Sequence, residues 1–203
     1  MRVEDPLRFP QGLEEKIEEY ALGYLRQGRA EWDEPHTRAA AFFAGEIALA
    51  EGLDVLVIRA AAWLHDTGWY ALFQDTDSKD YRNIMDKKEA HMVNGARLAK
   101  EFLERPDVKD FFSDAQRERI VHLVSVHDKI EELKDRDEIV LMEADTLGAI
   151  DVSRVTPTFD TETAIKYTNN DLLKRRFPKF QTPRGITLLY DIFPKFLAHF
   201  DKN

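Results

Sequence analysis

The chain has 203 residues and no cysteine, so it can bury one sizeable core but cannot form disulfides, cysteine-based zinc sites, iron–sulfur clusters or a thiol nucleophile. Apolar residues make up 43% of the sequence, which is too many for a disordered chain. The formal net charge of −9 argues against general nucleic-acid binding, which needs a basic face. We therefore expect no stable complex with nucleic acid.

The sequence also argues against a membrane protein. No apolar run reaches the roughly 18 residues that a membrane-spanning helix needs. The richest run, residues 55–64, is interrupted by Arg59. The first residues lack the basic start and apolar stretch of a secretory signal. We expect a cytoplasmic protein with no membrane association.

Helical periodicity dominates the first third of the chain, and alternating strand-like patterns are nearly absent. Asp33 and Asp54 are expected to cap the second and third helices. The first three predicted helices span about residues 13–24, 33–52 and 54–66.

A polar loop is predicted from about residue 68 to residue 86, followed by further helices. Ser113 or Asp114 is expected to cap the second of these, and Pro194 to kink the last. The chain from about residue 151 is expected to form a lid or subdomain. The predicted helices after the loop span about residues 86–103, 114–127, 137–150, 161–177 and 186–200.

Several apolar helix faces are interrupted by side chains that commonly bind metals. A lone inward histidine is usually a satisfied core residue, but here five predicted helices each contribute such a side chain. A buried carboxylate is costly unless it is paired or bound to a metal. The pattern therefore favours a shared metal site over independent polar residues in the core. The candidate ligands are His36, His65, Asp66, His91, His127 and Asp145.

The other histidines do not share this pattern. His122 lies on a polar helical stripe and is expected to point outward, and His199 is expected at the surface. Asp128 follows a candidate ligand directly, but it is followed by Lys129 and falls off the apolar face. We therefore exclude Asp128 from the expected ligands.

The order of these residues resembles the HD-domain superfamily of metal-dependent phosphohydrolases. Residues 60–68 are similar to that family's small-residue helix running into His-Asp-x-Gly, and residues 143–147 to its later Ala-Asp-x-Leu helix. The segment that begins at His91 resembles the His-x-x-x-Gly-Ala helix of the six-ligand branch, and His127 fits the next ligand of that branch.

The resemblance implies an all-α, HD-domain-like helical bundle over residues 33–150. Residues 151–203 would be a C-terminal helical extension within a single domain, 1–203. It also implies that Asp66 bridges two metal ions, one of them held with His91 and His127. Nitrogen and oxygen ligands suit manganese, iron, cobalt, nickel or zinc.

The implied activity is hydrolysis of a small phosphate ester by a metal-activated water, with a nucleotide as the first candidate substrate. His65 and Asp66 would be the catalytic residues. Trp69 stands where the family's cyclic-dinucleotide phosphodiesterases have lysine, and their Gly-Tyr-Pro signature is missing, so that activity is disfavoured. Two alternatives stay open: a di-iron oxygenase of the same superfamily, and a non-catalytic regulatory module.

A phosphorylated substrate needs cations beyond the metals. Residues 166–184 hold six basic side chains against one acid, which suits a small anionic ligand or a solvated helix face. The aromatic-rich C-terminus is either core or interface, so an oligomer is possible. The candidate substrate-binding residues are Arg38, Lys87, Lys88, Lys129, Arg175 and Arg176.

Overall fold

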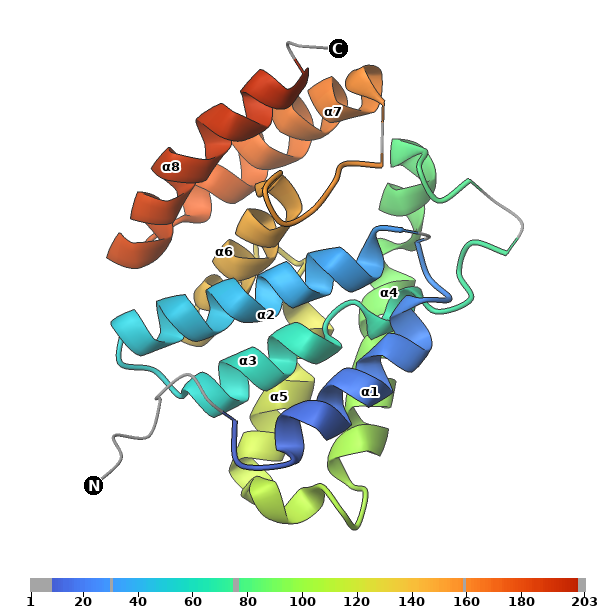
Figure 1. Cartoon of the computed structure of the whole chain (residues 1–203), viewed down its shortest axis with the longest axis vertical. Helices are drawn as coiled ribbons and strands as arrows, with labels where there is room; N and C mark the ends of the chain where they lie inside the picture. The colour runs from blue at the N-terminus through green and yellow to red at the C-terminus, as the bar shows by residue number, and fades with distance from the viewer. Residues whose placement is uncertain (1–8, 30, 75–76, 159, 201–203) are drawn as a thin grey trace.

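Helices form all the regular structure in the residues described by this computed structural model, which are 9–29, 31–74, 77–158 and 160–200 (Figure 1). The expected all-α fold is therefore confirmed. Short 3-10 or π-helical segments, labelled η, join some of the α-helices. The α-helices are α1 (Leu13–Leu25), α2 (Asp33–Ala50), α3 (Val55–Leu64), α4 (Tyr81–Leu103), α5 (Asp114–Val126), α6 (Arg136–Ile150), α7 (Thr161–Tyr167) and α8 (Pro183–Phe200).

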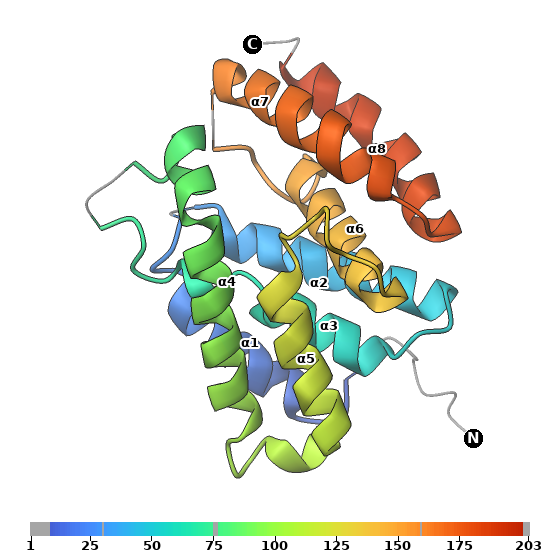
Figure 2. The ribbon, with the colours of Figure 1, turned by 180° about the vertical axis from the view of Figure 1, so that it is seen from behind.

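Helix α6 lies at the centre of the molecule (Figures 1 and 2). Every residue from Glu138 to Ile150 is buried, which is typical of a helix surrounded by others. Helix α2 packs along α6, and α3 packs against α2 and α5. At Gly148 the two backbones are so close that a Cβ atom would lie 2.8 Å from the amide nitrogen of Ala40. This close packing sets the position of α2 relative to α6.

A break between two helical segments places the His65-Asp66 dipeptide. Helix α3 ends at Leu64, and the 3-10 segment η1 (Thr67–Trp69) follows. A Cβ atom on Gly68 would lie 1.8 Å from the carbonyl oxygen of His91, so only glycine lets η1 pack this closely on α4. The break therefore turns the chain between α3 and α4. His65 and Asp66 lie at this turn.

Two predicted helix starts differ from the structure. Helix α4 begins at Tyr81 rather than about residue 86, because the Asp80 carboxylate caps it by accepting from the amides of Arg82 and Asn83 at 2.8 and 3.1 Å. Helix α8 begins at Pro183 rather than residue 186.

The predicted cap at Asp33 is wrong. Trp32 occupies the N-cap position of α2, and Asp33 is the first helical residue. The carboxylate of Asp33 accepts from the backbone amide of Arg29 at 2.5 Å and from its Nε at 2.6 Å. The carboxylate of Asp33 therefore binds Arg29 in the preceding turn instead of capping the amides at the start of α2.

The C-terminal segment forms a pair of antiparallel helical stretches at one end of the molecule (Figure 2). Helix α7 continues into a π-helix, η3 (Thr168–Arg176), then a 3-10 turn, η4 (Phe177–Lys179), and α8 returns. The buried carboxylate of Glu143 in α6 accepts from the amides of Gln181 and Thr182 at 2.7 and 3.0 Å. These bonds tie the start of α8 to the central helix.

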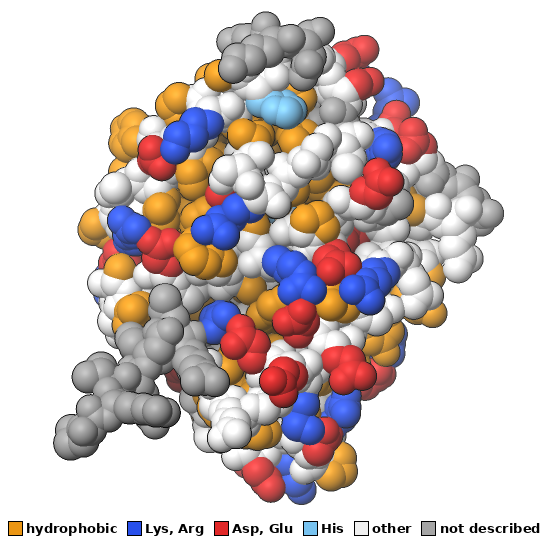
Figure 3. Space-filling model, in the orientation of Figure 1, with side chains coloured by type: hydrophobic (Ala, Val, Ile, Leu, Met, Phe, Trp, Pro, Cys, Tyr) orange, Lys and Arg blue, Asp and Glu red, His pale blue; other side chains and the backbone are white. Residues whose placement is uncertain are grey.

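Helices of the length and apolarity needed to cross a membrane were not found among the described residues. On the face shown in Figure 3, basic side chains are interspersed with acidic ones rather than gathered in one basic area.

Candidate metal centre

The structure brings together the six side chains that the sequence marks as candidate ligands. They come from five helices, and their side chains are buried. His36 lies in α2, His65 and Asp66 follow α3, His91 lies in α4, His127 follows α5, and Asp145 lies in α6.

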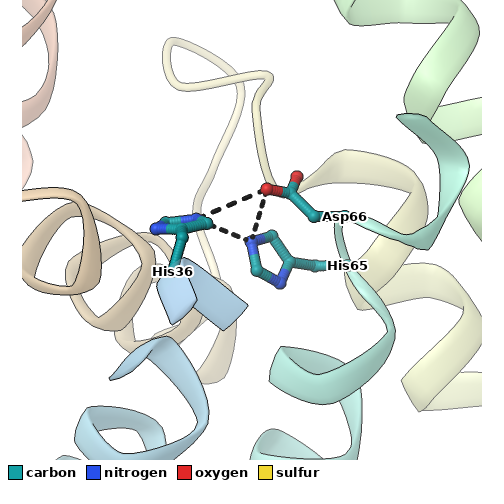
Figure 4. A group of neighbouring side chains, drawn as sticks. All are labelled: His36, His65 and Asp66. Carbon is teal, nitrogen blue, oxygen red and sulfur yellow. Dashed lines mark hydrogen bonds and ion pairs between the residues drawn. The ribbon is translucent and has the colours of Figure 1, made fainter. Parts of the chain in front are cut away.

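One group of nitrogen and oxygen atoms is formed by His36, His65, Asp66 and Asp145 (Figure 4 draws the first three). The Nε2 atoms of His36 and His65 lie 3.3 Å apart. Both are 3.4 Å from Oδ2 of Asp66. Oδ1 of Asp145 lies 3.0 Å from Nε2 of His36 and 3.5 Å from Nε2 of His65. The donor atoms of His36, His65 and Asp66 therefore lie close enough together to hold one ion, and Asp145 lies beside both histidines.

A second group is formed by His91, His127 and Asp66. The Nε2 atoms of the two histidines lie 3.1 Å apart, and each is 3.8 Å from Oδ1 of Asp66. Asp66 therefore presents one carboxylate oxygen to each group, which is the arrangement of a bridging ligand.

Two of the histidines have a tautomer set by the backbone. Nδ1 of His65 lies 2.7 Å from the carbonyl oxygen of Ala62, and Nδ1 of His127 lies 2.8 Å from that of Val124. A carbonyl can only accept, so Nδ1 carries the hydrogen and Nε2 keeps its lone pair for a metal. These two rings are therefore prepared as ligands, and the donor set fits a divalent transition metal.

The carboxylates of the first group raise the pKa values of its histidines. Burial works to lower the pKa of His36, but hydrogen bonds to Asp145 and Asp66 outweigh it and raise the pKa to about 9. The pKa of His65 is raised against its burial by the same two carboxylates. The pKa of Asp66 lies well below its usual range, because His65 and Arg29 outweigh the effect of burial.

The two histidines of the second group have lowered pKa values. Burial, helped by the neighbouring His127, lowers the pKa of His91 to about 3. Burial also lowers the pKa of His127. The histidines of the two groups therefore have pKa values shifted in opposite directions, although the groups share a carboxylate.

A pocket of about 830 Å³, including its opening to solvent, leads to these atoms. His36, Asp66 and Asp145 lie at its inner end, and Lys88 and Arg176 are among its walls. Aromatic and apolar side chains form much of the remaining wall, which suits the organic part of a ligand. These side chains are Trp32, Trp69, Tyr81, Ile84, Met85, Ala149 and Tyr167.

Arg176 is buried and joins three carboxylates. Its Nη1 lies 2.7 Å from Oδ2 of Asp145, its Nε lies 2.8 Å from Oδ2 of Asp171, and its Nη2 pairs with Asp128. Lys88 lies 3.2 Å from Oδ1 of the same Asp128. The two cations therefore share one carboxylate at the wall of the pocket.

The expectation that Asp128 leaves the apolar face is wrong. Its side chain is buried, and Oδ2 lies 3.8 Å from Nε2 of His91. Lys88 and Arg176 hold it there and keep its pKa below the usual range against burial. The helix α5 has already ended before His127, so helical periodicity no longer decides where the next residue points.

The other predicted substrate-binding residues lie outside the pocket wall. Arg38 is exposed and pairs with Glu18 at 2.6 Å and with Glu34 at 3.1 Å. Arg175 pairs with Glu131 at 2.7 Å. Lys87 lies with its ammonium 5.7 Å from the ring centre of Phe73. Lys129 is half-buried.

Two residues of the site have no signal in the sequence pattern. Arg29, in the turn before α2, donates to Oδ2 of Asp66 at 2.6 Å. Asp171 is buried beneath Arg176. Arg29 lies outside the predicted helices, and Asp171 is the single acid of a basic segment, so neither interrupts an apolar face.

The histidines expected outside the site do lie outside it. His122 is exposed and its Nε2 lies 2.7 Å from Glu138. His199 is half-buried near the end of α8.

Comparison with known proteins agrees with the site. The family model described as "HD domain" matches residues 35–150, which is more than half of the chain and contains all six candidate ligands. No significant match was found among curated proteins or among solved structures. Because the family model, the helical fold and the buried His-Asp cluster coincide on the same residues, the chain belongs to the HD-domain family, whose members are mostly metal-dependent phosphohydrolases.

Proposed function

We propose that this protein is a phosphohydrolase with two metal ions, and that it cleaves a small phosphate ester such as a nucleotide. The observation that carries the proposal is the pair of donor groups that share Asp66, with one carboxylate oxygen facing each group. This arrangement supports the six-ligand type of HD domain, with ions drawn from manganese, iron, cobalt, nickel and zinc.

The candidate ligands form two metal positions that share Asp66. His36, His65 and Asp145 would hold one ion, His91 and His127 the other, and Asp66 both. When bound, such ions supply a water that is acidic enough to act as a nucleophile near neutral pH and stabilise phosphate oxygens.

Cations on the pocket wall support a phosphorylated substrate. Lys88 and Arg176 both line the pocket, and Asp128 fixes their positions by accepting from both. Their charges offset the negative charge of a phosphate group as it binds. Lys87, Lys129, Arg38 and Arg175 stay candidates for weaker contacts at the surface.

The aromatic part of the wall supports a substrate with a planar group. Trp32 and Tyr167 line the pocket together with Tyr81, so a base or another flat ring can pack against their faces. Trp32 is already stacked on the ring of His36, with centroids 5.6 Å apart and an interplanar angle of 13°. An organic group at this place lies directly beside the metal ligands.

The experiment is a substrate panel with the purified protein and added Mn²⁺ or Fe²⁺. Nucleoside monophosphates and other small phosphate esters are compared by release of phosphate. Asp66→Ala should lower the rate on the order of 100-fold or more, since a metal ion contributes several kcal/mol to catalysis. His122→Gln is the control, because His122 is exposed and lies outside the site.

A fully active Asp66→Ala protein would overturn the assigned site. If the wild-type protein releases no phosphate but consumes oxygen when loaded with iron, it is a di-iron oxygenase instead. If elemental analysis finds no metal in the protein, even after incubation with each candidate ion, the non-catalytic module is the better description.

A further inference from the structure

Trp69 makes two different contacts with the candidate metal ligands. It lies in η1, three residues after Asp66, and is almost completely buried. Its indole N–H donates to Oδ1 of Asp66 at 2.9 Å. Its ring stacks on the imidazole of His91, with centroids 4.0 Å apart and an interplanar angle of 5°. One side chain therefore touches two of the three residues in the second donor group.

The stack on Trp69 replaces a hydrogen bond that other ligands have. His65 and His127 are oriented by Nδ1–H bonds to backbone carbonyls. Nδ1 of His91 is buried and has no hydrogen-bond partner among the described residues. The plane of its ring is therefore held by packing, and the parallel face of Trp69 is the surface that it packs on.

The indole N–H also sets the rotation of the shared carboxylate. Asp66 can serve both donor groups only if its oxygens point in different directions. Trp69 donates to Oδ1, the oxygen that faces His91 and His127, while Arg29 donates to Oδ2, which faces the other group. The guanidinium of Arg29 in turn lies 4.4 Å from the centre of the Trp69 ring. Trp69 and Arg29 together therefore hold one carboxylate oxygen of Asp66 each.

We propose that Trp69 is a positioning residue that sets the metal affinity of the second position, the one formed by Asp66, His91 and His127. It does so by fixing one ligand through its N–H and another through its ring. The first position depends on it less, because His36, His65 and Asp145 have no contact with the indole among the described interactions. The inference rests on the two-metal site proposed above.

The test is metal binding by the full-length protein without substrate. Mn²⁺ is titrated into metal-free protein, and both affinities are measured by calorimetry, with stoichiometry from elemental analysis. Trp69→Phe keeps an aromatic face and loses the N–H. We expect it to weaken the second ion about 10- to 100-fold, the usual effect of losing an outer hydrogen-bond partner, and the first ion less than about threefold. Trp69→Leu, which loses the ring face as well, should weaken the second ion further.

Trp63→Phe is the matched control. Trp63 is also a buried tryptophan, and its Nε1 has no hydrogen-bond partner among the described residues, so the same substitution removes no contact with the site. It should leave both affinities unchanged. If Trp69→Phe binds both ions like the wild type, the inference is overturned while the two-metal site survives. A wild-type protein that binds fewer than two ions overturns the proposed two-metal function itself, and the inference with it.

A second measurement needs no substitution and therefore holds even if Trp69→Phe does not fold. In protein with ¹⁵N-labelled tryptophan, the indole N–H signals are followed by NMR as Zn²⁺ is added. One indole proton should shift with occupancy of the second position, because Oδ1 of Asp66 accepts from it. If the indole signal of Trp69 responds to neither equivalent of Zn²⁺, the inference is overturned.

Discussion

The four buried imidazoles of the site carry different charges because their neighbours differ. His36 and His65 face two carboxylates, which raise their pKa values above the ordinary one despite burial. His91 and His127 face each other, and burial lowers theirs. A metal at the first position must therefore displace the proton of His36 at neutral pH, whereas a metal at the second position meets no such proton on His91.

The pH dependence of metal binding follows from this difference. At pH 7, His36 holds a proton because its pKa is about 9, and the proton competes with the metal. The competition weakens as the pH rises towards 9, so the affinity of one ion should increase by up to about tenfold per pH unit. His91, with a pKa of about 3, is neutral over this whole range, so the affinity of the other ion should stay flat.

Titrations of Mn²⁺ at pH 6.5, 7.5 and 8.5, repeated in buffers with different ionisation enthalpies, measure both the affinities and the protons released. Equal pH dependence of the two ions would contradict the assigned charges.

At the scale of the elements, the π-helix η3 determines which arginine reaches the site. Its backbone closes i to i+5 hydrogen bonds, so a side chain five residues after another lies close to the same face. Both arginines pair with Asp171, but Arg176 continues inward to Asp145, whereas Arg175 continues outward to Glu131. In a regular α-helix, positions i and i+5 would lie far apart around the axis.

Replacing the inward arginine should destabilise the metal-free protein. Arg176→Gln leaves Asp128, Asp145 and Asp171 buried without their shared cation, and breaking such a pair typically costs about 3–5 kcal/mol. The measurement is urea unfolding followed by circular dichroism. Arg175→Gln is the matched control on the preceding residue. Its pair with the exposed Glu131 is worth about 1 kcal/mol or less, and the buried Asp171, which it also contacts, keeps its bond to Arg176. Equal losses in the two variants would show that the π-helix does not separate their roles.

On the scale of the whole molecule, the C-terminal extension completes the pocket of the HD domain. The family match ends at residue 150, but Tyr167, Asp171 and Arg176 lie beyond it and line the same pocket as His36 and Asp66. Bonds from Glu143 to the start of α8 attach the extension to the central helix. We propose that the whole chain works as one domain with the extension as its lid.

Metal binding should stabilise this whole assembly, because its ligands come from five helices. Metal at about 100 times its dissociation constant adds about 2.7 kcal/mol to the free energy of unfolding. For a chain of this size, that corresponds to a rise of roughly 5–10 °C in the melting temperature. Thermal unfolding with Mn²⁺ and after treatment with EDTA measures it. His122→Gln should keep the full rise and Asp66→Ala should lose most of it; a rise that persists in Asp66→Ala would place the metal elsewhere.

The sequence by itself determined the all-helical fold and which six side chains cluster as candidate ligands. Histidine and aspartate on apolar helix faces are costly to bury singly, so their repeated occurrence already indicated a shared site. It also separated His122, whose helix face is polar, from the buried histidines. These conclusions depend on helical periodicity, which is a local property.

Only the tertiary structure decided how these residues work together. The two directions of the Asp66 oxygens, the opposite pKa shifts of His36 and His91, and the contact of Arg29 with the site all arise between segments distant in the sequence. Asp128 turned inward because the helix before it had ended, and periodicity no longer applied. Burial, charge pairing and side-chain stacking depend on three-dimensional neighbours, which no local pattern specifies.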